Sequence, residues 1–138
     1  MIVKVDVIAR MEVTLDPIRV MWVKAEGGLS GVGEAWSALE SKLPSLKGRK
    51  FYGSYHDNVY RACVAIIDEK EAETFGLPTW TIPGGRYVRE RVADYRSRVE
   101  VIAETFEAMA KECRADRSRP EVEFYRSQSE IILLLPIL

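Results

Sequence analysis

The apolar residues of this chain change twice from the alternating spacing of a β-strand to the three-and-four spacing of an α-helix. The first helical face is formed by Leu29, Val32, Trp36, Leu39 and Leu43. The second lies between Val99 and Cys113, and it is preceded by Ser97 and Glu100 at the spacing of a capping box. Extended segments flank each helix, so the sequence predicts two successive units in the order strand, helix, strand, strand.

The extended segments are rich in β-branched and aromatic residues and are separated by turn-forming residues. Strands are predicted at residues 1–13, 18–26, 49–57, 59–68, 78–92, 121–127 and 130–137. The polar sequence "HDN" joins the third and fourth of these as a hairpin. Pro83, Gly84 and Gly85 predict a bulge or bend that reverses which side chains face inward.

Two such units pack most economically with their strands in one antiparallel sheet and both helices on one face of it. The predicted fold class is therefore α+β, in a single domain over residues 1–138. A groove floored by the central strands follows if the helices do not touch along their length. Such a concavity is a typical ligand site.

The composition excludes several classes of function. Lys and Arg number 20 against 21 Asp and Glu, so the net charge of −1 provides no overall field for nucleic acid or an anionic membrane. The longest apolar run, residues 131–138, is too short to span a bilayer, which predicts a cytoplasmic protein. His56 and Asp57 lie in a turn and do not form a metal site. We therefore expect no metal, no cofactor and no direct nucleic-acid partner.

Five short motifs follow one another from about Ala35 to the C-terminus: "AWSAL", "FYGSYHD", "TWTIPGGRYV", "VEFYRS" and "LLLPI". In this order the sequence resembles the gyrase-inhibitor-like (GyrI-like) small-molecule-binding domains, which also serve as effector domains of bacterial multidrug-responsive transcription regulators. The resemblance implies the same doubled strand, helix, strand, strand unit. It also implies a ligand site in the groove between the halves.

The resemblance further implies roles for four residues. Glu123 in "VEFY" matches a buried acidic residue that receives cationic aromatic compounds in ligand-binding relatives, with Tyr125 in the same motif. Trp80 and Tyr87 would supply aromatic walls. Some relatives look like hydrolases of strained cyclopropane-bearing natural products. The chain departs from the family pattern at residues 89–94, where relatives often have small or apolar residues and a glycine, which bears on the breadth of the groove.

The strand period alone leaves the surroundings of Glu123 open. It shares one face with Glu121 and Tyr125, whereas the intervening apolar residues share the other. If the acidic face borders the groove, the Glu123 carboxylate is partly desolvated, and a cation or a hydrogen-bond donor would stabilise its charge. If that face points outward, Glu123 is solvated, as most charged residues are. As a third alternative, Arg89 or Arg91 pairs across strands with Glu121 or Glu123 and neutralises the site, in which case a neutral or anionic ligand would fit better.

Two other aromatic residues are candidates for ligand contact. Trp36 lies on the apolar stripe of the first helix and is interpreted first as core, with groove lining as the alternative. Phe51 and Tyr52 point to opposite faces of their strand, so only one of them can line the groove. We expect Tyr52, because a buried phenol hydroxyl needs a polar partner.

The sequence thus predicts a stand-alone binding domain for an amphipathic, aromatic or cationic small molecule, with Glu123 as its acidic anchor. The first alternative is a hydrolase of strained cyclopropane-bearing compounds, in which the same carboxylate acts as a general base or stabilises a developing cation. The second alternative is a protein-interaction or inhibitor module. The natural ligand and the oligomeric state stay open.

Overall fold

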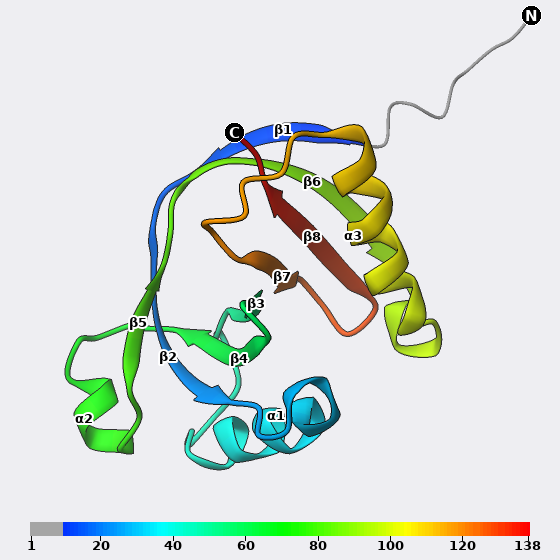
Figure 1. Cartoon of the computed structure of the whole chain (residues 1–138). Coiled ribbons are helices and arrows are strands. Elements are labelled where there is room, and N and C mark those ends of the chain that lie inside the picture. Colours follow the sequence, from blue (N-terminus) through cyan, green and yellow to red (C-terminus); the bar gives the residue numbers. More distant parts are fainter. Residues whose placement is uncertain (1–9) are drawn as a thin grey trace, which may run out of the picture.

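The computed structural model describes residues 10–138, so most of the strand predicted over residues 1–13 lies outside the described residues. Eight strands of the described part form one antiparallel sheet, in the order β1-β6-β8-β7-β3-β4-β2-β5 (Figure 1). The strands are β1 Met11–Leu15, β2 Ile18–Lys24, β3 Phe51–His56, β4 Val59–Ala65, β5 Thr79–Ile82, β6 Gly85–Ala93, β7 Glu121–Tyr125 and β8 Glu130–Pro136. The helices are α1 Val32–Ser41, α2 Glu71–Phe75 and α3 Glu100–Glu112, with short 3-10 segments η2 Gly28–Gly31 and η3 Tyr95–Ser97.

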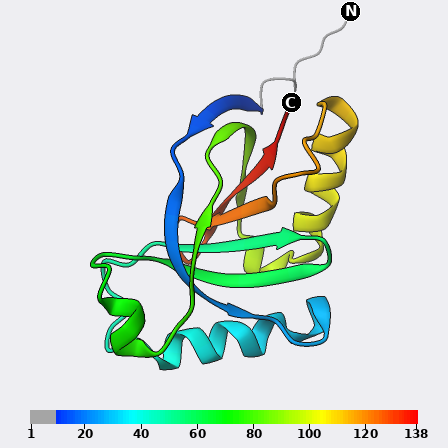
Figure 2. The same cartoon turned by 60° about the vertical axis from the view of Figure 1, so that its left-hand side comes forward.

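The predicted α+β fold is confirmed, because each half of the chain supplies one strand, one long helix and a two-stranded return. The first unit is β2, α1, β3 and β4, and the second is β6, α3, β7 and β8. Strand β7 pairs with β3, which joins the two units into one sheet. Figure 2 shows α1 and α3 on the same side of the central strands.

The alternation of side chains along the strands separates the core into helix-facing and back-facing layers. In β8, Leu133 packs beneath α3, whereas Ile132 and Leu134 belong to the cluster on the opposite face. Helix α1 contributes Ala35 and Leu39 to a further helix-facing cluster with residues of β2 and β4. Residues 131–136 of β8 are all buried, because both faces of this strand are covered. This explains why its sequence is continuously apolar rather than alternating.

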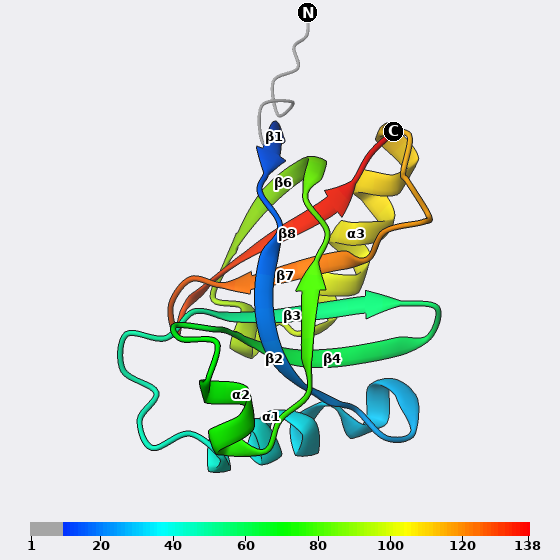
Figure 3. The same ribbon diagram turned by 90° about the vertical axis from the view of Figure 1, so that its left-hand side faces the viewer.

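The face of the sheet opposite the helices is covered by strands β1, β2, β5 and β6 of the same sheet. The run β1–β2 and the run β5–β6 pair along their length and bend at matching positions, since Leu15 pairs with Gly85 and Ile18 with Ile82. A side chain at Gly84 would collide with the Leu15 carbonyl oxygen, 2.7 Å from the added carbon, so glycine permits the two bends to pack together. Figure 3 shows this ribbon crossing in front of β3, β4 and β7.

The sequence correctly predicted the hairpin turn between β3 and β4, but it wrongly predicted a capping box at the start of α3. Asp57 and Asn58 both have positive φ, 50° and 64°, as the two central residues of a type I′ hairpin turn require. The predicted capping box does not form, because Val99 is the N-cap of α3 and the Ser97 hydroxyl bonds the Asp94 carbonyl instead. The short helix α2 lies between the strands predicted at residues 59–68 and 78–92, where the sequence predicted neither a helix nor a strand.

Within residues 10–138, none of the helices is both long and apolar enough to cross a bilayer.

Candidate functional site

A cavity of about 480 Å³ lies between α3 and the η2–α1 segment, over the middle of the sheet. Its floor is formed by side chains of β3, β4 and β7, namely Tyr55, Tyr60, Glu121, Glu123 and Tyr125. Its walls are mostly aliphatic, with Leu29 and Val32 on one side and Val99, Ile102, Phe106 and Ala110 on the other. The cavity is where the sequence analysis expects an inter-helix groove, and its volume is typical of small-molecule sites.

Glu123 faces this cavity because strand alternation and a glycine place it there. It shares the helix-facing side of β7 with Glu121 and Tyr125, whereas Val122 points into the back cluster. Its partner in register on β3 is Gly53. The absence of a side chain at Gly53 leaves the space into which the Glu123 carboxylate and the Tyr60 hydroxyl reach.

One carboxylate oxygen of Glu123 accepts hydrogen bonds from two phenol hydroxyls. Tyr60 donates to Oε1 at 2.8 Å and Tyr125 donates to the same oxygen at 2.7 Å. The indole N–H of Trp36 donates to the Tyr60 hydroxyl at 3.1 Å, and because indole is only a donor, the Tyr60 proton is left for Glu123. The second carboxylate oxygen has no hydrogen-bond partner among residues 10–138. The two phenol donors therefore hold Oε1 in place.

Burial sets the protonation behaviour of this network. It raises the pKa of Glu123, and the hydrogen bonds from Tyr125 and Tyr60 oppose that rise because they stabilise the carboxylate. It also raises the pKa of Tyr60 and of Tyr125, with the nearby Glu123 charge adding to both shifts. Both phenols therefore keep their protons at neutral pH, and they act as donors rather than as bases.

The network lies at the seam between the two helix-facing clusters. Tyr60 belongs to the α1 cluster and Tyr125 packs against the α3 cluster. Edge-to-face contacts frame Tyr125, with ring centroids 5.1 Å from Trp36 and 5.7 Å from Tyr95. The polar network thus fills the place where two apolar cores meet, and its aromatic frame fixes the direction of the donors.

No cation of residues 10–138 forms an ion pair with Glu121 or Glu123, so the alternative in which Arg89 or Arg91 neutralises the site is wrong. The two arginines share a face of β6 with Tyr87, which points into the back cluster, whereas Glu123 is on the helix face. Strand β8 also separates β6 from β7. Arg91 pairs instead with Glu130 at 2.8 Å.

Three predicted aromatic residues lie on the opposite face of the sheet from Glu123. Tyr52, Trp80 and Tyr87 all pack in the back cluster. The Tyr87 hydroxyl donates to the Pro83 carbonyl at 2.6 Å, and the Trp80 ring is covered by the Arg61 guanidinium. The structure therefore brings Glu123 and Tyr125 together with Trp36 behind them, and the expectation that Trp80 and Tyr87 flank Glu123 is wrong.

Phe51, rather than Tyr52, is on the helix-facing side of β3, contrary to the sequence-based choice. The Tyr52 ring stacks on Phe124 with centroids 5.0 Å apart. The preference for Tyr52 rested on the polar partner that a buried hydroxyl needs, but the register of β3 against β7 decides the face instead.

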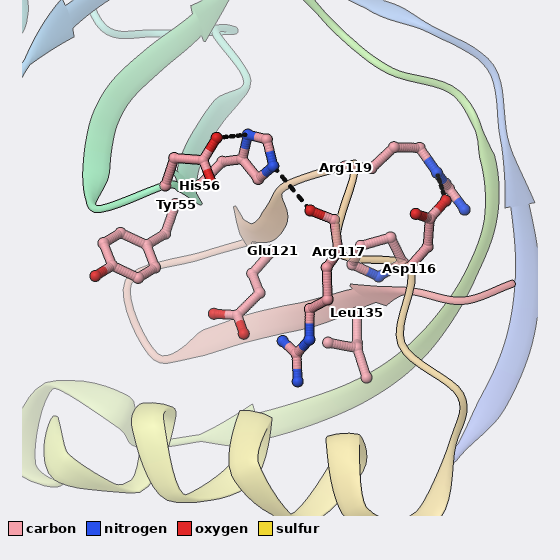
Figure 4. A pocket seen from close by; sticks show the side chains of 9 residues that line it. Tyr55, His56, Asp116, Arg117, Arg119, Glu121 and Leu135 are labelled. Atoms are coloured by element: carbon pink, nitrogen blue, oxygen red, sulfur yellow. Dashed lines mark hydrogen bonds and ion pairs between the residues drawn. The ribbon is translucent and has the colours of Figure 1, made fainter.

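A second, smaller cavity of about 170 Å³ adjoins the first at the end of the strands (Figure 4). Tyr55, Arg117 and Glu121 line both cavities. His56 Nε2 lies 3.1 Å from the Arg117 carbonyl oxygen, which ties the segment after α3 to the β3–β4 hairpin. No group of three His, Cys, Asp or Glu side chains in the described residues could hold a metal ion.

Three solved structures share this fold over nearly the whole chain. An integron cassette protein from the mobile metagenome of Vibrio cholerae is 13% identical with a TM-score of 0.72, over 95% of this chain and 97% of that one. The protein SAV2435, solved bound to tetraphenylphosphonium, is 10% identical with a TM-score of 0.62, over 94% and 93%. A hydrolase from Listeria innocua is 15% identical with a TM-score of 0.55, over 94% and 91%.

The chain has the gyrase-inhibitor-like fold. At these identities the likeness establishes the fold. No protein-family model matches the sequence, and no curated protein matches it.

Sequence reasoning missed several residues of the cavity in this gyrase-inhibitor-like fold. Tyr60 was assigned only to a strand, although it is two residues beyond a two-residue turn whose geometry fixes its pairing with Tyr55. Gly53 carried a signal of a different kind, since an isolated glycine in a strand indicates close approach by another group. The walls from α3 had no signal beyond their helical period.

Proposed function

We propose that this protein binds amphipathic aromatic cations in the cavity between α3 and the η2–α1 segment, with Glu123 as the anionic anchor. One observation carries the proposal: Glu123 lies on the floor of a largely apolar cavity, and no cation of residues 10–138 forms an ion pair with it. A half-buried, partly desolvated carboxylate of this kind is costly unless a counter-charge or a hydrogen-bond donor arrives. A bound organic cation supplies that charge.

The surroundings of Glu123 favour an organic cation over a hydrated metal ion. Tyr60 and Tyr125 line the cavity beside the carboxylate, and aromatic rings at such a place can make cation–π contact with an organic cation. Phe106 and Ile102 on α3 provide apolar contact for the body of the ligand. Because both phenols donate to Oε1, the carboxylate stays oriented before the ligand binds, which lowers the ordering cost of binding.

The comparison with SAV2435 gives further support. That protein, which has the same fold, was solved with tetraphenylphosphonium, a lipophilic aromatic cation. The cavity of the present chain, about 480 Å³, falls in the range of sites that bury most of a drug-sized ligand.

Tetraphenylphosphonium is therefore the probe for the first experiment. Titration calorimetry and thermal shift should detect binding to the wild type, and Glu123→Gln should lower the affinity by about tenfold or more, the size of a partly desolvated charge contact. The matched control is Glu104→Gln, which removes the same charge from an exposed position of α3 outside the cavity. Absence of binding to the wild type, or equal affinity of both variants, would refute the anchor.

A hydrolase is a second candidate, favoured by the two phenols that converge on one carboxylate oxygen. In that case Glu123 would act as a general base through its free oxygen or stabilise a positive charge that develops in the substrate. The likeness to the Listeria innocua hydrolase agrees with this class of function. Turnover of a strained cyclopropane-bearing substrate that is lost in Glu123→Gln and kept in Glu104→Gln would favour it over simple binding.

A further inference from the structure

We propose that the cavity contains a second anionic subsite at Glu121, and that its ligands are elongated dications whose second charge lies at the junction of the two cavities. The inference rests on the proposed function, since Glu123 holds the first charge. It names the class of ligand that the cavity distinguishes from a simple monocation.

The geometry of β7 provides the two positions. Glu121 and Glu123 are two residues apart on the same face of one strand, so their Cα atoms are separated by about 7 Å. Both line the larger cavity, and Glu121 also lines the smaller one that adjoins it. A ligand that lies along β7 therefore meets two carboxylates in succession.

Glu121 is half-buried and has no ion-pair partner among residues 10–138. Figure 4 shows its side chain pointing toward α3, in the same direction as Tyr55 and Arg117, whereas Asp116 and Arg119 turn away and pair with each other at 2.9 Å. Burial raises the pKa of Glu121, which Arg117 opposes and the charge of Glu123 reinforces. A desolvated carboxylate beside a second one is stabilised by a nearby cation.

Arg117 does not already fill this role. Its side chain is exposed, and it comes no closer to Glu121 than the 4 Å limit of an ion pair. With Glu107, the larger cavity is lined by three carboxylates against this one guanidinium, an excess of two negative charges. An anionic substituent on the ligand would meet that excess, whereas a second cation reduces it.

Three matched probes test the proposal by titration calorimetry. The first probe, benzyltrimethylammonium, carries one positive charge. The second, 1,4-bis(trimethylammoniomethyl)benzene, carries a second positive charge at the para position. The third, 4-carboxybenzyltrimethylammonium, carries a carboxylate there instead. The wild type should bind the dication about tenfold more tightly than the monocation, as a half-buried charge pair implies. The zwitterion should bind more weakly than either.

The variants separate the two subsites. Glu121→Gln should abolish the preference for the dication, whereas Glu123→Gln weakens the binding of both the monocation and the dication. Arg117→Gln should keep or increase the preference, because it removes a like charge. Glu104→Gln is again the control for the loss of one negative charge, and a thermal melt of each variant confirms that it is folded.

Three outcomes would overturn the second subsite: a wild type without preference for the dication, a preference that survives Glu121→Gln, or tightest binding of the zwitterion that depends on Arg117. The proposed function is tested separately in the same series. If tetraphenylphosphonium and the monocation bind through Glu123 while the dication gains nothing, only the subsite at Glu121 is lost. If no cation binds the wild type, the proposed function fails and the subsite fails with it.

Discussion

Replacement of Gly53 by alanine tests the arrangement around Glu123 most directly. A β-carbon at this position would lie 2.9 Å from Tyr60 Cζ and would overlap with both the Tyr60 hydroxyl and Glu123 Oε1. Neither group can move aside freely, because the Tyr60 hydroxyl accepts a hydrogen bond from Trp36 and donates one to Glu123. The added methyl group must therefore break the network or displace the strand.

The magnitude follows from the two effects of the methyl group. Overpacking of a filled interior costs about 1–3 kcal/mol, and loss of a hydrogen bond to a charged group costs about 1.5–3 kcal/mol. The effects overlap, since relief of the clash is what breaks the bond. We expect Gly53→Ala to lower the free energy of unfolding by about 2–4 kcal/mol and to weaken tetraphenylphosphonium binding by about tenfold.

Urea denaturation followed by circular dichroism gives the first quantity, and titration calorimetry gives the second. The control is Gly33→Ala on α1, where an added β-carbon meets no atom within 4 Å and where alanine should be neutral or stabilise by up to about 1 kcal/mol. If Gly53→Ala is as stable as the wild type and binds the cation equally well, Tyr60 and Glu123 do not occupy the space above Gly53.

Two further predictions concern the same network. Trp36→Phe keeps an aromatic ring but removes the N–H that orients Tyr60, so the free energy of unfolding should fall by about 1 kcal/mol and the affinity for tetraphenylphosphonium by about threefold in calorimetry; unchanged affinity would show that Trp36 does not orient the site. Because burial raises the pKa of Glu123 above its ordinary value of 4.5, the folded protein holds this proton more tightly than the unfolded chain does. The stability that Glu123 contributes is therefore greatest below that value and is lost as the pH rises through the folded-state pKa. The unfolding free energy of the wild type, measured in urea relative to Glu123→Gln, should decrease as the pH is raised above 4.5, and a difference that is constant or rises would contradict the shift.

Strand and helix periods were sufficient to predict the architecture. The β-branched and aromatic residues of 59–65 indicate a strand, and the three-and-four spacing in residues 32–41 indicates a helix face that must be buried. The capping box at Ser97 failed because a cap depends on the backbone path into the helix. That path is set by the bend at Asp94, where φ is 54°, and by the 3-10 turn after it.

The sequence did not predict which aromatic residues line the cavity. Trp80 and Tyr87 have the composition of ligand walls, yet they pack behind the sheet, because the bend at Pro83–Gly85 and the pairing with β1 and β2 turn them away from the helices. Tyr60 and Phe106, which come from segments with no motif of their own, line the cavity instead.

The amino-acid sequence by itself determined the order of the elements, the single antiparallel sheet with both helices on one face, and the pairing of Glu123 with Tyr125 on one side of a strand. These features depend on period and on neighbours a few residues apart. Only the tertiary structure decided which face of the sheet the helices cover, that Gly53 and Tyr60 make room for the carboxylate, and that Arg89 and Arg91 are on the far side from it. Register between strands distant in the sequence fixes all of these, and a shift of one residue in that register would exchange the two faces.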